Sequence, residues 1–161
     1  MNQKIEQAFN THINAELYSS YLYLAMSNCF VAKNFDGMGK WMRLQAGEEY
    51  GHAMKFLDFI HQRNGRVLLQ AIEQPQLDWN SPLAAFQQAY EHELAISRKI
   101  DALVELAAAE KDHAAANFLQ WFVNEQVEEE AHSLAIVEQL KMVGDSPISL
   151  LMMDRHLGSR S

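Results

Sequence analysis

The segment Glu48-Glu49-Tyr50-Gly51-His52 lies in the middle of a long amphipathic stretch and places ionisable side chains on its apolar face. Glu49 and His52 fall one helical turn apart on that face. The same face carries the flanking residues Trp41, Gln45, Phe56 and Phe59. Burying an unpaired carboxylate costs several kcal/mol unless a cation or a hydrogen-bond partner compensates. The sequence therefore predicts that the rest of the chain supplies this compensation.

Composition limits the classes of protein to be considered. Of the 161 residues, 48% are hydrophobic and 21% are charged, as in an ordinary globular protein, and the length predicts one domain over 1–161. A formal net charge of −8 favours cations over nucleic acid as partners. Cys29 is the single cysteine and the first residues form no apolar leader, which together predict a cytoplasmic location. No segment approaches the roughly 20 apolar residues of a membrane span.

Helical periodicity predicts an all-α fold with four long helices and a short fifth one. The expected helices cover about 2–32, 37–64, 82–107, 113–143 and 147–157. Asp36, Ser81 and Asp112 are expected to cap the second, third and fourth helices, and Gly144 to end the fourth. The apolar line of the first helix is expected to consist of Ile5, Phe9, Ile13, Leu17 and Leu24.

The stretch from 66 to 80 has no helical period and contains Pro75. This is long for a connection within a compact domain, where about 4–6 residues is typical. In a four-helix bundle such a loop can cross the full length of the bundle and make the next helix parallel to the previous one. The chain is therefore predicted to form two antiparallel hairpins joined by a long crossover, with the bundle at about 2–143.

An internal symmetry relates the polar residues on the predicted buried faces. Three pairs are separated by the same 77 positions: Glu16 and Glu93, Glu49 and Gln126, and His52 and Glu129. Each hairpin thus places one carboxylate on its first helix and a polar pair, at positions i and i+3, on its second. The layout resembles that of dinuclear carboxylate bundles, where two helices give one Glu each and two give Glu-x-x-His.

Two divalent ions held close together need several anionic oxygen ligands, and one carboxylate can bridge both ions. A mixture of carboxylate and imidazole ligands is typical of sites for iron or manganese, whereas thiolate-rich sites are typical of zinc or copper. We expect Glu16, Glu49 and His52 to bind one ion, with Glu49 as the bridge. Glu93 and Glu129 then hold the second ion more weakly, because the second hairpin offers the neutral Gln126. The alternative is a buried polar network, but no Lys or Arg lies on these faces to neutralise the acids.

Three segments together resemble the bacterial non-haem ferritins. They are Glu16 to Tyr23 (ELYSSYLY), Glu48 to Ala53 (EEYGHA) and Asn117 to Glu130 (NFLQWFVNEQVEEE). The similarity covers essentially the whole chain, including the crossover and the fifth helix, and implies a ferritin-like four-helix bundle. It implies a ferroxidase that oxidises Fe(II) with dioxygen or peroxide and deposits ferric oxyhydroxide inside a homo-oligomeric shell of twenty-four subunits.

The resemblance also assigns roles to individual residues. The implied iron ligands are Glu16, Glu49, His52, Glu93 and Glu129, with Gln126 nearby. Tyr23 lies seven residues after Glu16, and its implied role is to hydrogen-bond a ligand carboxylate and supply an electron. The alternative is a core tyrosine whose hydroxyl simply finds a partner. The resemblance further implies a third iron site built from Glu48, Glu125 and Glu128, with Glu129 shared; here the alternative is a solvated acidic face.

The sequence disfavours a haem cofactor and one other class of activity. Haem-binding relatives carry a methionine directly after the bridging Glu, where this chain has Tyr50, so no haem is expected. The alternative function is a di-iron oxidase or peroxidase of rubrerythrin type without mineral storage. That class needs an electron donor, and the chain has no Cys-x-x-Cys module. The apolar segment at 148–153 resembles the short ferritin helix that meets its copies, which predicts oligomerisation.

Overall fold

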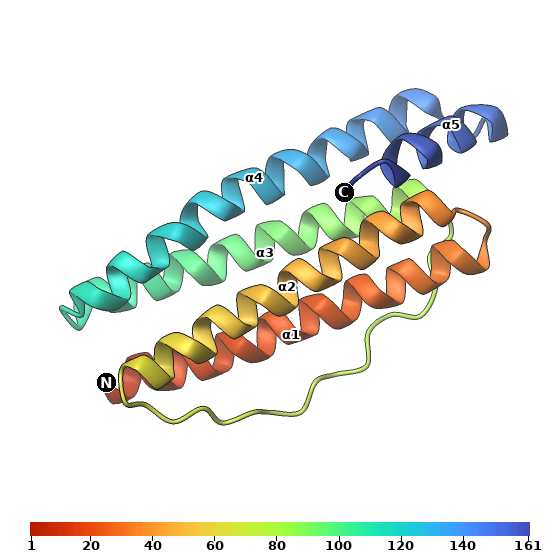
Figure 1. The fold of residues 1–161 in the computed structure, drawn as a ribbon. Helices are drawn as coiled ribbons and strands as arrows, with labels where there is room; N and C mark the ends of the chain where they lie inside the picture. The colour runs from red at the N-terminus through yellow and green to blue at the C-terminus, as the bar shows by residue number, and fades with distance from the viewer.

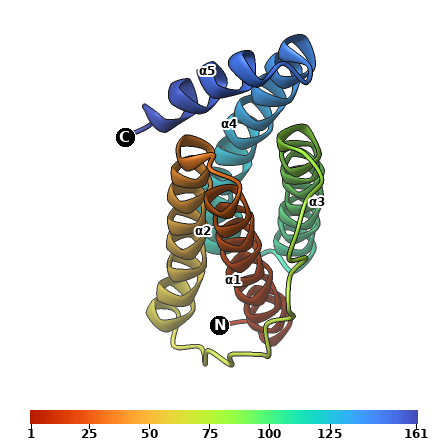
Figure 2. The ribbon, with the colours of Figure 1, turned by 90° about the vertical axis from the view of Figure 1, so that its right-hand side faces the viewer.

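The computed structural model describes all 161 residues and contains five α-helices and no strands. Their bounds are α1 Gln3–Ala32, α2 Asp36–Gln62, α3 Pro82–Ala109, α4 His113–Val143 and α5 Pro147–Gly158. The four long helices form a bundle, and α5 turns back from the end of α4 at an angle to them (Figures 1 and 2). The all-α prediction and the five predicted segments are confirmed, with helix ends shifted by only a few residues.

Two of the three predicted capping residues start their helices as expected. Ser81 accepts a hydrogen bond from the backbone N–H of Ala84, and Asp112 accepts one from Ala115. Gly144 ends α4 with a positive φ of 60°, a conformation that glycine adopts at little cost.

The start of α2 differs from the prediction, because Asp36 does not cap it. Phe35 occupies the capping position without a side-chain hydrogen bond, and Asp36 is already helical. The missing acceptor comes from another helix: Oδ1 of Asp154, in α5, accepts the backbone N–H of Met38 at 2.7 Å. A buried carboxylate at a helix N-terminus also complements the helix dipole. The sequence spacing gave no sign of this cap, because it joins residues 116 positions apart.

The buried line of α1 also differs from the prediction. Leu17 is only partly buried and Leu24 is 39% exposed. Beyond Ile13 the buried face follows other residues, namely Glu16, Ser19, Leu22, Tyr23, Met26, Ser27, Cys29 and Phe30. The predicted line was wrong because leucine and tyrosine occur on both sides of the helix between positions 17 and 24. The structure places both Glu16 and Tyr23 on this buried face.

The crossover between α2 and α3 runs along the outside of the bundle from one end to the other (Figure 1). It makes α3 parallel to α2, as predicted, and α1 parallel to α4. Asn10 of α1 fixes its first part by donating to the carbonyl of Arg66 at 2.9 Å and accepting from the N–H of Leu68 at 2.6 Å. Trp79 anchors its other end because its ring is buried in the core and its Nε1–H donates to Gln88.

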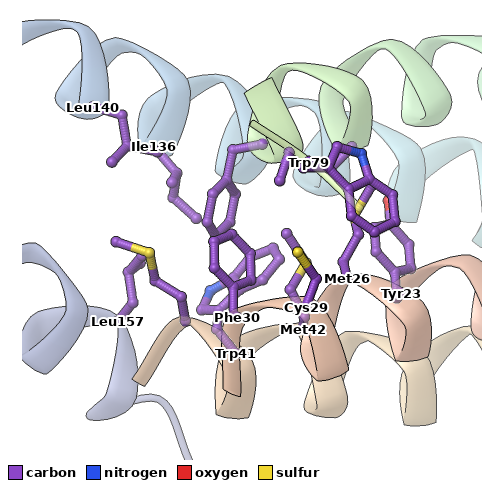
Figure 3. Packing of buried hydrophobic residues seen from close by; sticks show 14 of the residues in the cluster. Tyr23, Met26, Cys29, Phe30, Trp41, Met42, Trp79, Ile136, Leu140 and Leu157 are labelled. Carbon is purple, nitrogen blue, oxygen red and sulfur yellow. The ribbon is translucent and has the colours of Figure 1, made fainter. Parts of the chain in front are cut away.

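The apolar core consists of two clusters, one toward each end of the bundle. In the first, Phe30 and Trp41 lie near Ile136 and Leu140 of α4 and Leu157 of α5 (Figure 3). The second is built from residues such as Phe9, Phe56, Ile100, Leu119 and Phe122. On each long helix, buried polar residues separate the stretch that joins one cluster from the stretch that joins the other. The fold therefore contains a polar layer across its middle.

None of the five helices combines the length and the apolar character that crossing a membrane requires.

Candidate metal centre

The polar layer contains all six residues related by the 77-residue offset. Each long helix contributes at least one of them, and every one is at least nine-tenths buried: Glu16, Glu49, His52, Glu93, Gln126 and Glu129. In a helix, residues three or four apart share a face, which is why Glu49 and His52 of α2 point inward together, as do Gln126 and Glu129 of α4. The two hairpins thus present their polar residues to each other.

The ligand atoms within this layer form two overlapping groups. Glu16, Glu49 and His52 each offer an atom within 4.8 Å of the others, and Glu49, Glu93 and Glu129 do the same. Glu49 is common to both. This is the division that the sequence predicted for two ions bridged by one carboxylate.

The residues present fit divalent cations, and an unsatisfied atom supports this. Oε1 of Glu16 receives a hydrogen bond from His12, but its Oε2 is buried without any partner. Buried polar atoms nearly always have a partner, so an orphaned carboxylate oxygen close to the carboxylate of Glu49 indicates a place for a cation. Hard divalent cations prefer oxygen ligands, and imidazole extends the choice to iron.

Burial shapes the electrostatics of the layer. Loss of solvation, together with neighbouring carboxylates, raises the pKa of Glu49 and the pKa of Glu93 to about 8, and that of Glu129 to about 7. Burial lowers the pKa of His52, but its contact with Glu49, 3.4 Å from Nδ1, outweighs this and raises the pKa to about 9. For Glu16, burial is outweighed by the hydrogen bond from His12, and its pKa is lowered. Ionisation of Glu49, Glu93 and Glu129 is therefore unfavourable unless a cation compensates their charge.

These raised pKa values predict that divalent cations displace protons when they bind. Glu49, Glu93 and Glu129 are largely protonated at pH 6.5, and a metal ligand must give up its proton. We expect Zn²⁺, which undergoes no redox change, to release about four protons per chain at pH 6.5, three from these carboxyls and one from His52, and to bind more tightly as the pH rises toward 8. Isothermal titration in buffers of different ionisation enthalpy measures the protons released. Equal affinity at pH 6 and pH 8 would contradict the prediction.

The stability of the metal-free protein should depend on pH with the corresponding sign. A carboxyl group whose pKa is raised by folding leaves stability unaffected below its unfolded pKa, where both states are protonated, and stability is lost as the pH rises from there to its folded pKa. For these three carboxyls the loss falls between about pH 5 and pH 8. Bound metal replaces the protons, so the metal-loaded protein should not show this loss.

Two residues that contact the ligands were missed as site residues by the sequence analysis. His12 of α1 is 3% exposed, and its Nε2 lies 2.7 Å from Oε1 of Glu16. Gln45 of α2 is 1% exposed and donates from Nε2 to Glu49 at 3.1 Å and to Glu129 at 2.7 Å. Partners of this kind hold ligands in position. His12 precedes Glu16 by four residues, so helical spacing was the signal that would have found it.

Tyr23 and Gln126 both contact Glu93. The hydroxyl of Tyr23 donates to Oε1 of Glu93, and burial followed by the charge of Glu93 raises the pKa of the phenol well above its usual range. Gln126 donates from Nε2 to Oε2 of Glu93 at 3.2 Å and to Ser97 at the same distance. The tyrosine therefore stays protonated and can act as a hydrogen-bond donor to a candidate ligand.

The residues expected to form a third site are only partly brought together. Glu125 is half-buried and lies with His52 and Glu129 in a third group of ligand atoms within 4.8 Å. Glu48 is exposed and paired with Arg160 instead. Glu128 is also exposed and belongs to none of the three groups.

A four-helix bundle with a long crossover and a buried layer of carboxylates and histidine in overlapping groups is the architecture of the carboxylate metal-binding proteins. The family model described as a ferritin-like domain matches residues 6–143. The chain belongs to the ferritin family, as its sequence motifs indicated.

Known relatives match over nearly the full length of the chain. A bacterial non-heme ferritin of Bacteroides fragilis is 43% identical over 99% of both chains, and one of Campylobacter jejuni is 36% identical over 98% of this chain and 94% of its own. The crystal structure of an open pore ferritin from the archaeon Archaeoglobus fulgidus superimposes with a TM-score of 0.99 at 50% identity, covering 100% of this chain and 99% of the other. Membership of this family supports iron binding, iron storage and, in general terms, iron oxidation.

Proposed function

We propose that the protein is a ferroxidase that oxidises Fe(II) and stores the product. The observation that carries the proposal is the pair of ligand groups that share Glu49. Glu16, Glu49 and His52 bind one Fe(II), while Glu93 and Glu129 bind the second. The unpartnered Oε2 of Glu16 supports the first position.

The charges of the layer suit this reaction. Glu16, Glu49, Glu93 and Glu129 supply four negative charges when ionised, which balance two divalent ions. Dioxygen or peroxide accepts the electrons that the ions lose, and each oxidised ion then carries one more positive charge than the ligands balance. Hydroxide or oxide derived from water makes up the difference. Because Gln126 is neutral, the second position holds its product with less negative charge than a glutamate at position 126 would give it, which favours release toward storage.

Storage requires an assembly, and we propose a homo-oligomeric shell of twenty-four subunits in which ferric oxyhydroxide is deposited. Apolar side chains exposed on α5 support contacts between copies: Ile148 is 74% exposed, Met152 67% and Leu151 51%. Ferritins are cage-forming oligomers, and the chain matches ferritin structures along its whole length. A cytoplasmic location is part of the proposal, supported by the free thiol of Cys29.

We further propose that Glu125 and Glu129 take part in a third iron position. Their approach to His52 supports it. Glu48 and Glu128 would join it only after their side chains move, and for Glu48 this means separation from Arg160.

The proposal is tested by adding Fe(II) aerobically in large excess over two ions per chain. Size-exclusion chromatography then follows protein and iron together. Iron that elutes with a particle of the size of a hollow shell supports oxidation with storage. If only about two irons per chain stay with a small oligomer while the rest precipitates, storage is wrong, and an oxidase of rubrerythrin type accounts better for the site.

A further inference from the structure

Arg160, which follows α5, reaches back over α2 and ends beside the metal centre. Its guanidinium lies over the ring of Trp41, 4.6 Å from the centroid, and donates to the carbonyl of Trp41 at 3.4 Å. It also donates to the carboxylate of Glu48 and, from Nη1, to Oε1 of Gln45 at 3.0 Å. Stacking on the indole and a pair with Glu48 hold the cation in one place.

The contact with Gln45 fixes which way its amide faces. A guanidinium only donates hydrogen bonds, so the amide oxygen must face Arg160. The amide nitrogen must then face the opposite way, where it donates to Oε1 of Glu49 and Oε2 of Glu129. These carboxylates belong to the group of ligand atoms that also includes Glu93. If the amide were reversed, its oxygen would face the carboxyl oxygens of Glu49 and Glu129, and these two hydrogen bonds would be lost.

We propose that Arg160 is a positioning residue for the metal centre, acting through the amide of Gln45. This inference rests on the proposed function, since it concerns the same ligands. The two hydrogen bonds from Gln45 hold one oxygen of Glu49 and one of Glu129, leaving their remaining lone pairs for the ions. Outer partners of this kind typically contribute a 10–100-fold effect on metal affinity. Through Arg160, the segment after α5 sets the geometry of two ligands inside the bundle.

Two substitutions of Arg160 separate its role as a donor from its bulk. Arg160→Met removes the cation and is expected to weaken binding of the second ion about tenfold. Arg160→Lys keeps a group that only donates, so it keeps the orientation of Gln45 and is expected to retain most of the affinity. The probe is Co²⁺ under anaerobic conditions, whose affinity comes from titration calorimetry and whose visible absorption reports ligand geometry.

The dependence on Gln45 is tested in a double-mutant cycle. Gln45→Leu removes the amide, so adding Arg160→Met to it should weaken Co²⁺ binding no further. Arg155→Met, at an exposed position of α5, is the matched control and should bind as the unmodified protein does. Circular dichroism and elution volume establish that each variant is folded and assembled.

The outcomes distinguish this inference from the proposed function. If the unmodified protein binds no Co²⁺, the metal centre itself is wrong. If it binds two ions per chain and Arg160→Met leaves affinity and absorption unchanged, only the role of Arg160 is wrong. An equal loss with and without the Gln45 amide would also overturn it, because Arg160 would then act by another route.

Discussion

Replacing Glu49 with glutamine is expected to lower the initial rate of Fe(II) oxidation by about 100-fold or more. Replacing a residue that only contacts the ligands typically lowers activity by about 10–100-fold. Glu49 is the one residue common to both ligand groups, so its loss affects both ions. Glutamine keeps the size of the side chain and can still accept the hydrogen bond from Gln45. It removes the charge, the oxygen that faces Nδ1 of His52 at 3.4 Å, and the ability of the group to bridge two cations.

The rate is measured from the absorbance of the ferric product after stopped-flow mixing with air-saturated buffer. Asp58→Asn, at an exposed position of the same helix, is the matched control and should react as fast as the unmodified protein. The Glu49→Gln protein should fold. Burial raises the pKa of the Glu49 carboxyl, so replacing this group removes an unfavourable contribution to the folding free energy of the metal-free protein. A rate within threefold of the unmodified one (roughly 0.7 kcal/mol of activation free energy) would show that the centre lies elsewhere.

Replacing Gly37 with alanine is expected to detach α5 from the bundle. A Cβ atom at Gly37 would lie 1.9 Å from the backbone oxygen of Asp154. Because the clash is between the backbones of two helices, no change of side-chain rotamer can relieve it. Detachment loses the cap on Met38 and exposes Met153 and Leu157, a total of about 4 kcal/mol. Since α5 carries the apolar residues proposed to join copies, large assemblies should also fail to form.

Amide hydrogen exchange over 147–158 and elution volume measure the two effects. Gly47→Ala is the matched control on the same helix, because a Cβ atom there meets nothing within 4 Å. It should leave α5 protected, and it should slightly stabilise α2, since alanine favours the helix over glycine by about 1 kcal/mol. Unchanged protection of α5 in the Gly37→Ala protein would contradict the proposed docking.

The sequence predicted the features that follow from regular spacing. Helical periodicity located the helices, and the polar pair predicted on the buried face of α4, Gln126 and Glu129, is buried. The acids could be identified as site residues because burying Glu16, Glu93 or Glu129 in an apolar helix face is energetically costly without a partner. The 77-residue offset then indicated that they meet at one level, and the structure brings them within reach of shared cations.

Features that depend on distant contacts were not predictable in this way. Arg160 reaches Gln45 from 115 positions away, and Asp154 caps α2 from another helix. No local pattern encodes such pairings, because they depend on the angle at which α5 returns over the bundle. The error at Leu24 has a different cause: apolar residues surround α1 there, so periodicity does not define a single face.

The crossover has a consequence for how cations assemble the centre. Glu49 and His52 belong to one hairpin, whereas Glu93 and Glu129 belong to the other, so the proposed pair of ions would be shared between two halves. If the halves were separate polypeptides, metal would have to recruit a partner from solution, and occupancy would fall on dilution. A covalent link gives the second half a local concentration on the order of millimolar or higher. The crossover outside the bundle thus keeps both sets of proposed ligands on one polypeptide, so their affinity for metal would not depend on protein concentration.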